Sequence, residues 1–279
     1  MGFMIMTRSD EVHHYVPQFY LRHWCDKHGK LWVHPVDGSA PFQSTPKSLA
    51  AEKGLYATGA FPELRHWDQE GDLSLIESGF ARVWPNIFED ISDLRTKMNV
   101  ARYLALTWLR HPNQKKQVRA INRTLIRNAK HAPAGEGEAV INAKDHDEVF
   151  HVSRVLEKAT ETDANTNEGF LRMMREAVPD IAEVLCSRRW AVVEAGNSVF
   201  ATGDTPLVLW RGKCTRPHYG LGTPGTQLSF PICPTKLLMI SDQLASDGFI
   251  HSLQSLGNIN SGVTSVATRF VFTCDGTIH

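Results

Sequence analysis

The stretch VARYLALTWL, residues 100–109, decides the fold class because it is apolar nearly all the way round a helix. A helix without a polar face is buried on every side, so we expect it at the centre of the protein, with Trp108 largely buried. Just before it, apolar residues recur at the spacing of one helix face. These residues are Ile76, Phe80, Val83, Ile87 and Ile91. Pro85 interrupts the stripe and should kink the helix there.

Outward from these helices, the chain divides into a helical and a β-rich part. Further helices are expected at about 115–130, 145–160 and 168–188, which gives a central helical block at about 72–188. After Arg189, short β-type runs alternate with turn residues, a pattern typical of antiparallel strands. These runs are 190–194, 199–202, 207–210, 227–232 and 237–240, followed by a helix at about 253–267 and a last strand at 269–274. The sequence therefore predicts an α+β fold, with the helical block packed on a mainly antiparallel sheet at about 189–279.

The N-terminal part is a mixed segment. Pro17 favours a short helix that ends near Trp24, and residues 31–36 have strand composition. Thr45-Pro46 is typical of a helix start and predicts a short helix to about Glu52, with another strand at 55–57. No repeat and no low-complexity segment divides the chain, so we expect a single domain over residues 1–279.

The composition is that of an ordinary globular protein. Hydrophobic residues make up 42% and charged residues 22%, and 30 Lys plus Arg balance 30 Asp plus Glu, so no overall basic field signals nucleic-acid binding. The five cysteines are scattered and form no CxxC pair, which favours a reducing compartment over disulfides or a thiolate zinc site. No signal peptide is visible, and no apolar stretch approaches the ~20 residues that span a bilayer. We expect a soluble, cytoplasmic protein without a membrane partner.

Two segments carry the most unusual polar residues. In HHYVPQFYLR, residues 13–22, the adjacent His13 and His14 point in different directions and cannot chelate one metal as an i, i+4 pair does. One could face a site while the other packs as an ordinary hydrogen-bonded histidine. In FATGDTP, residues 200–206, Asp204 ends a strand, where a carboxylate can bind a metal, orient a histidine or act as a base. This stretch alone favours a simpler interpretation, in which Asp204 caps its turn.

Two further polar positions lie in apolar surroundings. Glu77 is close to the apolar face of its helix, and an unpaired buried charge is costly, so we expect Arg110 as its partner. The pair could be purely structural, or Glu77 could position Arg110 on a phosphate. Asn260 lies in the last predicted helix, where a satisfied structural amide is the default. Motifs for dinucleotide binding, ATP hydrolysis, zinc proteases, serine hydrolases and protein kinases are absent from the sequence.

Together these segments resemble the bacterial domain-of-unknown-function family number 4238. The similar segments, in the family's order, are His13–Arg22, Gly29–Val33, Ala50–Glu52 leading to Tyr56, Leu109–Pro112, Phe200–Pro206, Phe230–Pro231, and the Asn260 helix followed by Ala267–Arg269. The resemblance implies one shared fold along nearly the whole chain but brings no activity. The family usually has serine directly before the aspartate that corresponds to Asp204 and often asparagine directly after it. Here these residues are Gly203 and Thr205, which weakens any role for their side chains.

The resemblance also indicates which positions matter together: His13, His14, Glu52, Glu77, Arg110, Asp204 and Asn260. Such a mixture suits a phosphate ester or a metal-bound water. The first hypothesis is a metal-dependent hydrolase, a nuclease or other phosphodiesterase. Its catalytic residues would be His13, His14, Glu52, Glu77 and Asp204, its substrate-binding residues Arg110 and Asn260, and its metal ligands His14 and Asp204, with a divalent cation of open identity.

Two other hypotheses stay open, so the sequence does not decide whether the protein is an enzyme. One is a non-catalytic module that binds a nucleotide, nucleic acid or another partner, and the other is a structural polar network. The hydrolase hypothesis predicts that His13 or His14 meets Asp204 across a pocket, because the aromatic helix after Pro17 must dock on the core. It is separated from the structural hypothesis by whether these side chains line one open pocket.

Overall fold

The structure is a computed structural model that describes residues 12–55, 67–117, 119–120, 138–143, 146–151, 167–196, 199–216, 219–250 and 256–278. The helices are α1 (Gln18–Leu21), α2 (Trp67–Val83), α3 (Leu94–Leu109), α6 (Asn167–Cys186) and α7 (Leu256–Val266). The strands are β1 (Val12–His14), β2 (Leu31–Pro35), β3 (Phe42–Ser44), β4 (Ala51–Lys53), β5 (Glu138–Ala143), β6 (His146–His151), β7 (Arg189–Glu194), β8 (Thr202–Gly203), β9 (Val208–Trp210), β10 (Gln227–Cys233), β11 (Lys236–Ser241), β12 (Gly248–Ile250) and β13 (Phe270–Thr273). Helices packed with mainly antiparallel sheets confirm the α+β class.

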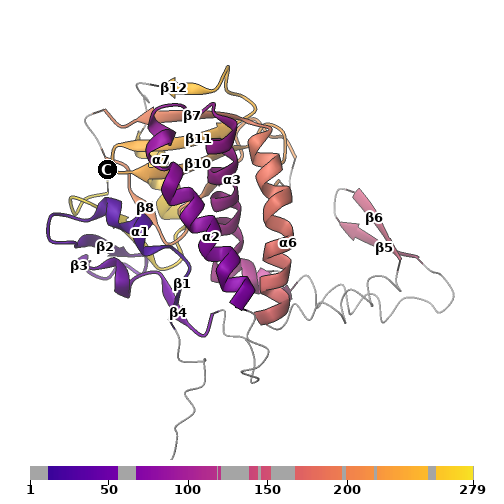
Figure 1. Ribbon diagram of the computed structural model, residues 1–279, viewed down its shortest axis with the longest axis horizontal. Coiled ribbons are helices and arrows are strands. Elements are labelled where there is room, and N and C mark those ends of the chain that lie inside the picture. Colours follow the sequence, from indigo (N-terminus) through magenta and orange to yellow (C-terminus); the bar gives the residue numbers. More distant parts are fainter. Residues whose placement is uncertain are drawn as a thin grey trace, which may run out of the picture.

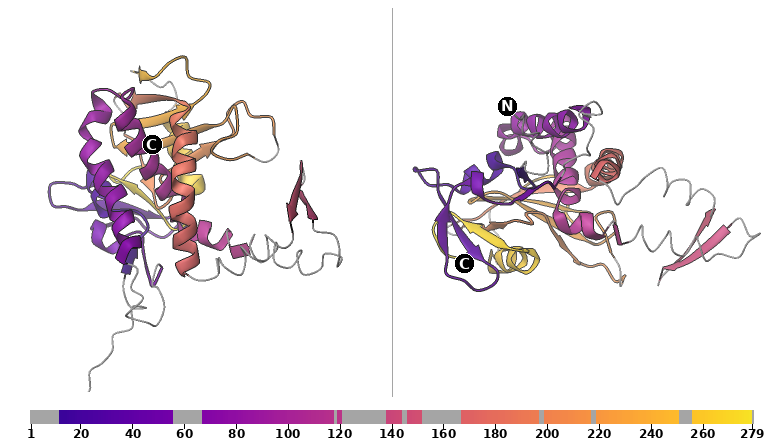
Figure 2. Two further views of the ribbon diagram at one scale, coloured as in Figure 1. Left: turned by 45° about the vertical axis from the view of Figure 1, so that its right-hand side comes forward. Right: turned by 90° about the horizontal axis from the view of Figure 1, so that it is seen from below.

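Helices cover both faces of the larger sheet. This sheet has the strand order β12-β7-β11-β10-β9, and all its pairs are antiparallel except β12 with β7. Helices α2, α3 and α6 lie side by side on one face, and α7 lies on the opposite side (Figures 1 and 2). The predicted helical block and the β-rich region therefore form successive layers.

Helix α3 is the packing centre, as its apolar sequence predicts. Tyr103, Leu104 and Leu106 are fully buried, and the Tyr103 ring stacks on Phe80 of α2 with centroids 3.7 Å apart. Helix α2 ends at Val83 and a 3₁₀ turn begins at Pro85, because proline cannot donate the next helical hydrogen bond. Trp108, which was expected to be largely buried, is partly buried and packs against the main core.

A second sheet joins the two ends of the described chain. Its strand order is β3-β2-β13-β8, and β13 pairs with β2 on one side and β8 on the other. The main hydrophobic core extends from Tyr15 to Phe272 and includes side chains of α2, α3, α6 and both sheets. Such a core is what a single domain over 1–279 would have, although the domain assignment itself stays a prediction.

Two predicted helices are wrong where the structure describes them. The one expected at 45–52 is a single 3₁₀ turn, Pro46–Ser48, after which Ala50 adopts φ +48° and the chain enters β4. The one expected at 145–160 is strand β6 over 146–151, which pairs with β5. In both places cross-strand pairing outweighed local helical preference. Residues 112–117 and 119–120 are helical, while the rest of 115–130, residues 152–160 and 56–57 lie outside the described residues.

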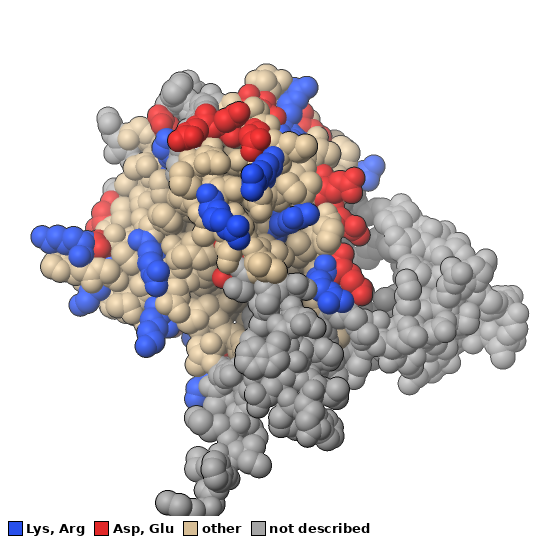
Figure 3. All heavy atoms as spheres, in the orientation of Figure 1, with Lys and Arg blue, Asp and Glu red and all other residues tan. Residues whose placement is uncertain are grey.

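On the face seen in Figure 3, Lys and Arg side chains lie among Asp and Glu side chains and form no continuous basic surface. None of the described helices combines the length and apolarity that crossing a membrane requires.

Candidate functional site

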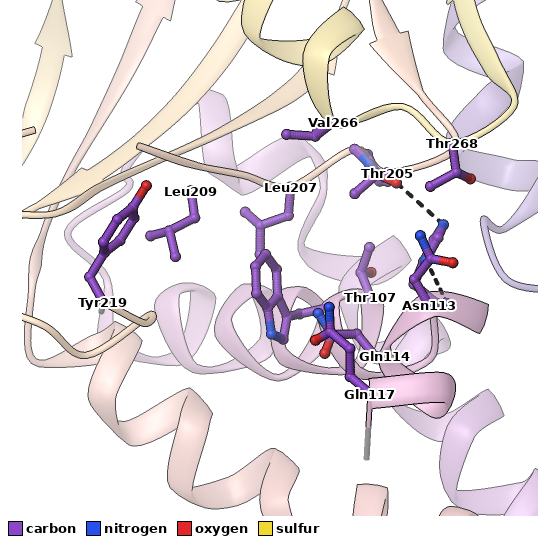
Figure 4. A pocket seen from close by; sticks show the side chains of 13 residues that line it. Thr107, Asn113, Gln114, Gln117, Thr205, Leu207, Leu209, Tyr219, Val266 and Thr268 are labelled. Atoms are coloured by element: carbon purple, nitrogen blue, oxygen red, sulfur yellow. Dashed lines mark hydrogen bonds between the residues drawn. The ribbon is translucent and has the colours of Figure 1, made fainter. Parts of the chain in front are cut away.

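A pocket of about 400 Å³ lies where the end of α3 meets the loop after β8 and the end of α7 (Figure 4). The helical turn at 112–117 and strand β9 complete its walls. The described lining residues are Thr107, Trp108, His111, Asn113, Gln114, Gln117, Thr205, Pro206, Leu207, Leu209, Tyr219, Val266 and Thr268. A cavity of this volume is large enough for a small organic ligand.

The two ends of the pocket differ in character. The Tyr219 ring lies at one end, Thr205 and Thr268 lie at the other, and Gln114 and Gln117 lie along one wall between them (Figure 4). Among the described lining residues there is no Lys, Arg, Asp or Glu. The pocket therefore offers aromatic surface and neutral hydrogen-bonding groups, and it suits the uncharged part of a ligand.

His111 ties the polar end of the pocket to the backbone. Its Nδ1 accepts a hydrogen bond from the Asn113 backbone N–H (3.1 Å), and its Nε2 lies 3.3 Å from Thr205 Oγ1. Burial lowers the pKa of His111 from its usual 6.5, so the ring is neutral near pH ~7. A neutral imidazole whose Nδ1 accepts carries its hydrogen on Nε2. The Nε2–H therefore donates to the Thr205 hydroxyl.

Asp204 has a buried, fully engaged carboxylate. Its exposed fraction is 0%. Oδ1 accepts from the Thr268 N–H (2.8 Å), and Oδ2 accepts from the Thr268 hydroxyl and the Arg269 N–H (2.7 Å each). These bonds fasten the loop after β8 to the turn between α7 and β13. Asp204 thus caps the distant turn at 268–269, and the expectation that it caps its own turn is wrong in the turn it named.

A charged cluster surrounds Tyr15, just behind the polar end of the pocket. The Tyr15 ring packs edge-on against His111, with centroids 5.3 Å apart. Burial, together with the charges of Asp204 and Glu52, raises the pKa of Tyr15 to about 12, and the nearby Arg269 side chain opposes this rise. The carboxylates of Asp204 and Glu52 also act on His111 and raise its pKa against the larger effect of burial. This cluster joins β1, β4, α3, the β8 loop and β13.

The two histidines of the N-terminal motif face different surroundings. Strand β1 pairs with β4 so that His13 lies directly opposite Glu52, a position in which neighbouring side chains can interact. The His14 Nε2 lies 3.0 Å from the Lys47 carbonyl oxygen. The contacts of His14 and of Asp204 thus involve other groups, and Tyr15 is the motif residue that lies near Asp204. The expected meeting of histidine and Asp204 has no support from these contacts.

Glu77 and Arg110 form the predicted ion pair. Arg110 Nη1 lies 2.5 Å from Glu77 Oε1, and only 2% of Arg110 is exposed. Placing the guanidinium against the carboxylate avoids the large cost of a buried lone charge. Neither residue lines the pocket, so this pair joins α2 to α3, and a phosphate clamp at Arg110 stays a prediction.

Asn260 fastens α7 to the segment before β8. Its Oδ1 accepts from the Ala201 N–H (2.9 Å), and its Nδ2 donates to the Val199 carbonyl (3.0 Å). The residue is 1% exposed. These contacts fit the satisfied structural amide, which is the default for buried amides, and substrate binding by Asn260 stays a prediction.

Glu52 is a predicted site residue whose charge acts on the pocket residue His111. Its carboxylate is exposed and acts electrostatically on Tyr15, His111 and Lys115. Among the described residues no group of three or more His, Cys, Asp or Glu side chains is placed to share a metal ion. Cation binding by His14 and Asp204 stays a prediction.

Sequence reasoning missed the residues at the polar end of the pocket. His111 lies inside the segment Leu109–Pro112, but only its neighbour Arg110 was singled out. Thr205 was discounted because it departs from the family's usual residue, and Thr268 and Tyr15 were passed over as motif neighbours. The signal that could have found His111 is its place directly after a helix that is apolar all round, where a polar side chain must meet other elements.

Comparison with known proteins places the chain in a family. The family model described as "Protein of unknown function (DUF4238)" matches residues 12–277, so the chain belongs to this family. No curated protein and no solved structure matches it. The segments that carried the resemblance in the sequence include those that meet around Tyr15, His111 and Asp204.

Proposed function

We propose that this chain is a binding module whose pocket takes the flat, uncharged ring of a nucleotide-like ligand. The observation that carries the proposal is the lining: Trp108 and Tyr219 supply aromatic surface, and Asn113, Gln114 and Gln117 supply amides, without a charged residue among the described lining positions. Aromatic side chains stack on bases, and Asn and Gln amides match the donor and acceptor pattern of base edges.

Cationic side chains at the margins of the pocket support a ligand that also carries phosphate. The guanidinium carbon of Arg211, an exposed residue, lies 5.7 Å from the Tyr219 ring centroid, and its Nε donates to the Cys214 carbonyl (3.0 Å). At the other end, the charge of the exposed Lys116 acts on His111. A base in the pocket would leave its phosphate near one of these cations, which are suited to bind it.

The proposal is tested by calorimetry and ligand-detected NMR with the purified chain and a panel of nucleosides and nucleotides. Tyr219→Leu should weaken binding about fivefold or more, because stacking on one aromatic ring is worth about 1–3 kcal/mol per base. Phe42→Leu is the matched control, since Phe42 is a similarly exposed aromatic outside the pocket (42% exposed against 38% for Tyr219). Absence of binding to every compound, or equal losses in both variants, would reject the proposal.

A second candidate function is hydrolysis of a phosphodiester, by a nuclease or a related hydrolase. It is favoured by the cluster of Glu52, Tyr15, His111 and Arg269 beside the pocket. Glu52 could activate water as a base or as a ligand of a divalent cation, and Arg269 could stabilise the phosphate. His111 does not activate Thr205 in the described tautomer, because its Nε2 already carries a hydrogen. Attack by water, rather than by Thr205, is therefore the route that this geometry supports.

The hydrolase candidate is tested with RNA, single- and double-stranded DNA and small phosphodiesters, in Mg²⁺, Mn²⁺, Zn²⁺ or a chelator. Glu52→Gln should reduce any activity by at least ~100-fold, the usual contribution of a general base. Glu89→Gln, at an exposed acid beyond the cluster, should leave it unchanged. Activity that survives Glu52→Gln excludes this assignment, and the absence of activity on all substrates leaves the binding module.

A further inference from the structure

We infer that the Thr205 hydroxyl is the specificity-determining donor of the pocket and selects rings that carry a hydrogen-bond acceptor, a carbonyl oxygen or an imine nitrogen, at their edge. The inference deepens the proposed binding function and rests on it. It concerns a residue that lines the polar end of the pocket, as Figure 4 shows.

A directed series of hydrogen bonds fixes the role of this hydroxyl. The Asn113 backbone N–H can only donate, so the His111 Nδ1 that faces it at 3.1 Å must accept. The neutral ring then carries its hydrogen on Nε2, which donates to Thr205 Oγ1 at 3.3 Å. Thr205 therefore receives a hydrogen bond from His111 and keeps its own hydrogen for another partner.

No described group of the protein takes that hydrogen. The nearest carboxylate in the sequence, Asp204, already accepts from the Thr268 N–H, the Thr268 hydroxyl and the Arg269 N–H. Within the described part of the chain, Thr205 has no hydrogen bond besides the one to His111. Its side chain is half-buried and lines the pocket, so its free hydrogen is available to a ligand acceptor.

The glutamine amides of the wall cannot impose the same choice. Gln114 and Gln117 each offer both a carbonyl acceptor and an amide donor, and rotation of the amide lets either group meet the ligand. These side chains add affinity for any polar ring edge. Thr205 differs because His111 fixes it as a donor, so unlike these amides it can discriminate between ligands with and without an acceptor.

The binding test compares inosine with indole riboside, whose ring system carries no hydrogen-bond acceptor. The unmodified chain should prefer inosine by about tenfold, the effect of one hydrogen bond to a desolvated acceptor. Thr205→Ser, which keeps the hydroxyl, should retain the preference. Thr205→Val, which has the same shape without it, should abolish the preference by weakening inosine binding alone.

The outcomes separate the inference from the function on which it rests. If neither nucleoside binds the unmodified chain, the proposed function fails, and this inference fails with it. If both bind and Thr205→Val keeps the preference for inosine, the binding function survives and the role of Thr205 is overturned.

A measurement without ligand tests the same series. Nitrogen-15 NMR of the imidazole groups, with His111→Gln to assign the signals, should show His111 unprotonated at Nδ1 and protonated at Nε2 near pH ~7. A hydrogen on Nδ1 would make Thr205 the donor to His111 and would overturn the inference. Circular dichroism of the Thr205 variants confirms that they fold.

Discussion

Asp204 and Thr205 are adjacent in the sequence but belong to two different regions of the molecule. Asp204 is fully buried, and its carboxylate accepts three hydrogen bonds from the 268–269 turn. Thr205 is half-buried at an open pocket and has one described partner, His111. The difference shows that a buried, fully bonded carboxylate holds the architecture, whereas an incompletely bonded neutral group at a pocket is available for recognition.

The structural role of Asp204 is tested most directly by substituting Asp204 itself. Asp204→Ala should destabilise the protein by about 3 kcal/mol or more, because it leaves three donors without an acceptor. Denaturation in urea, followed by circular dichroism, measures the change. Asp204→Asn, which keeps one acceptor oxygen, should cost less. A loss below ~1 kcal/mol for the alanine variant would mean that the turn does not depend on this carboxylate.

Asn260 tests the same architectural region by a smaller change. Asn260→Ala should cost about 1–3 kcal/mol, because the buried Ala201 N–H and Val199 carbonyl lose their partner. The control is Asn86→Ala, an exposed asparagine, which should stay within about 0.5 kcal/mol of the unmodified protein. Equal effects at the two positions in the same denaturation experiment would contradict the structural role of Asn260.

Acid should act on the pocket region through His111. Burial lowers its pKa in the folded protein, so the unfolded chain takes up the proton first, and stability contributed by the neutral ring is lost as pH falls below about 6.5. Asp204 and Glu52 oppose this shift and Lys116 reinforces it. His111→Gln should therefore flatten the acid loss of stability. His23 and His34, whose pKa values burial also lowers, remain in both proteins as an internal control. An unchanged pH profile would show that His111 is not the group responsible.

The smallest effect on stability is expected on the pocket wall. Gln117→Ala changes an exposed side chain and should alter the free energy of unfolding by no more than about 0.5 kcal/mol. Its effect on ligand affinity should be larger than its effect on stability, the reverse of Asn260→Ala. Titration of the nucleoside panel alongside urea denaturation measures both. A large loss of stability would move Gln117 into the architectural region.

Local sequence patterns predicted much of the fold but not its long-range pairings. The buried helix at 100–109 and the break at Pro85 were predicted because both depend on neighbouring residues. The predicted helix at 45–52 is wrong because β1, far back in the sequence, pairs with Ala51–Lys53 and Ala50 turns the chain into that pairing. Such partners leave no mark on local periodicity.

The candidate site was predictable from the sequence only where an unpaired buried charge would be costly. A carboxylate beside an apolar helix face demands a partner, which predicted the Glu77–Arg110 pair. The hydrogen bond between His111 and Thr205 depends on where two loops meet after folding and on which imidazole nitrogen of His111 carries the hydrogen. Neither property follows from residue spacing. The expected contact between His13 or His14 and Asp204 likewise depends on loop geometry and stays a prediction, and the motif residue on which the charge of Asp204 acts is Tyr15.

The pairing of β13 with β2 bears on the order in which the molecule is made. Strand β2 ends at Pro35 and its neighbour β13 begins only at Phe270. During synthesis, β2 therefore cannot pair with β13 until residues 270–273 have been made. Contacts of such high sequence separation fold slowly. Because Arg269 and Thr268 directly precede β13, the groups that engage Asp204 arrive with it. We therefore expect the pocket to be completed in the last steps of folding, and an interrupted chain to have no competent site.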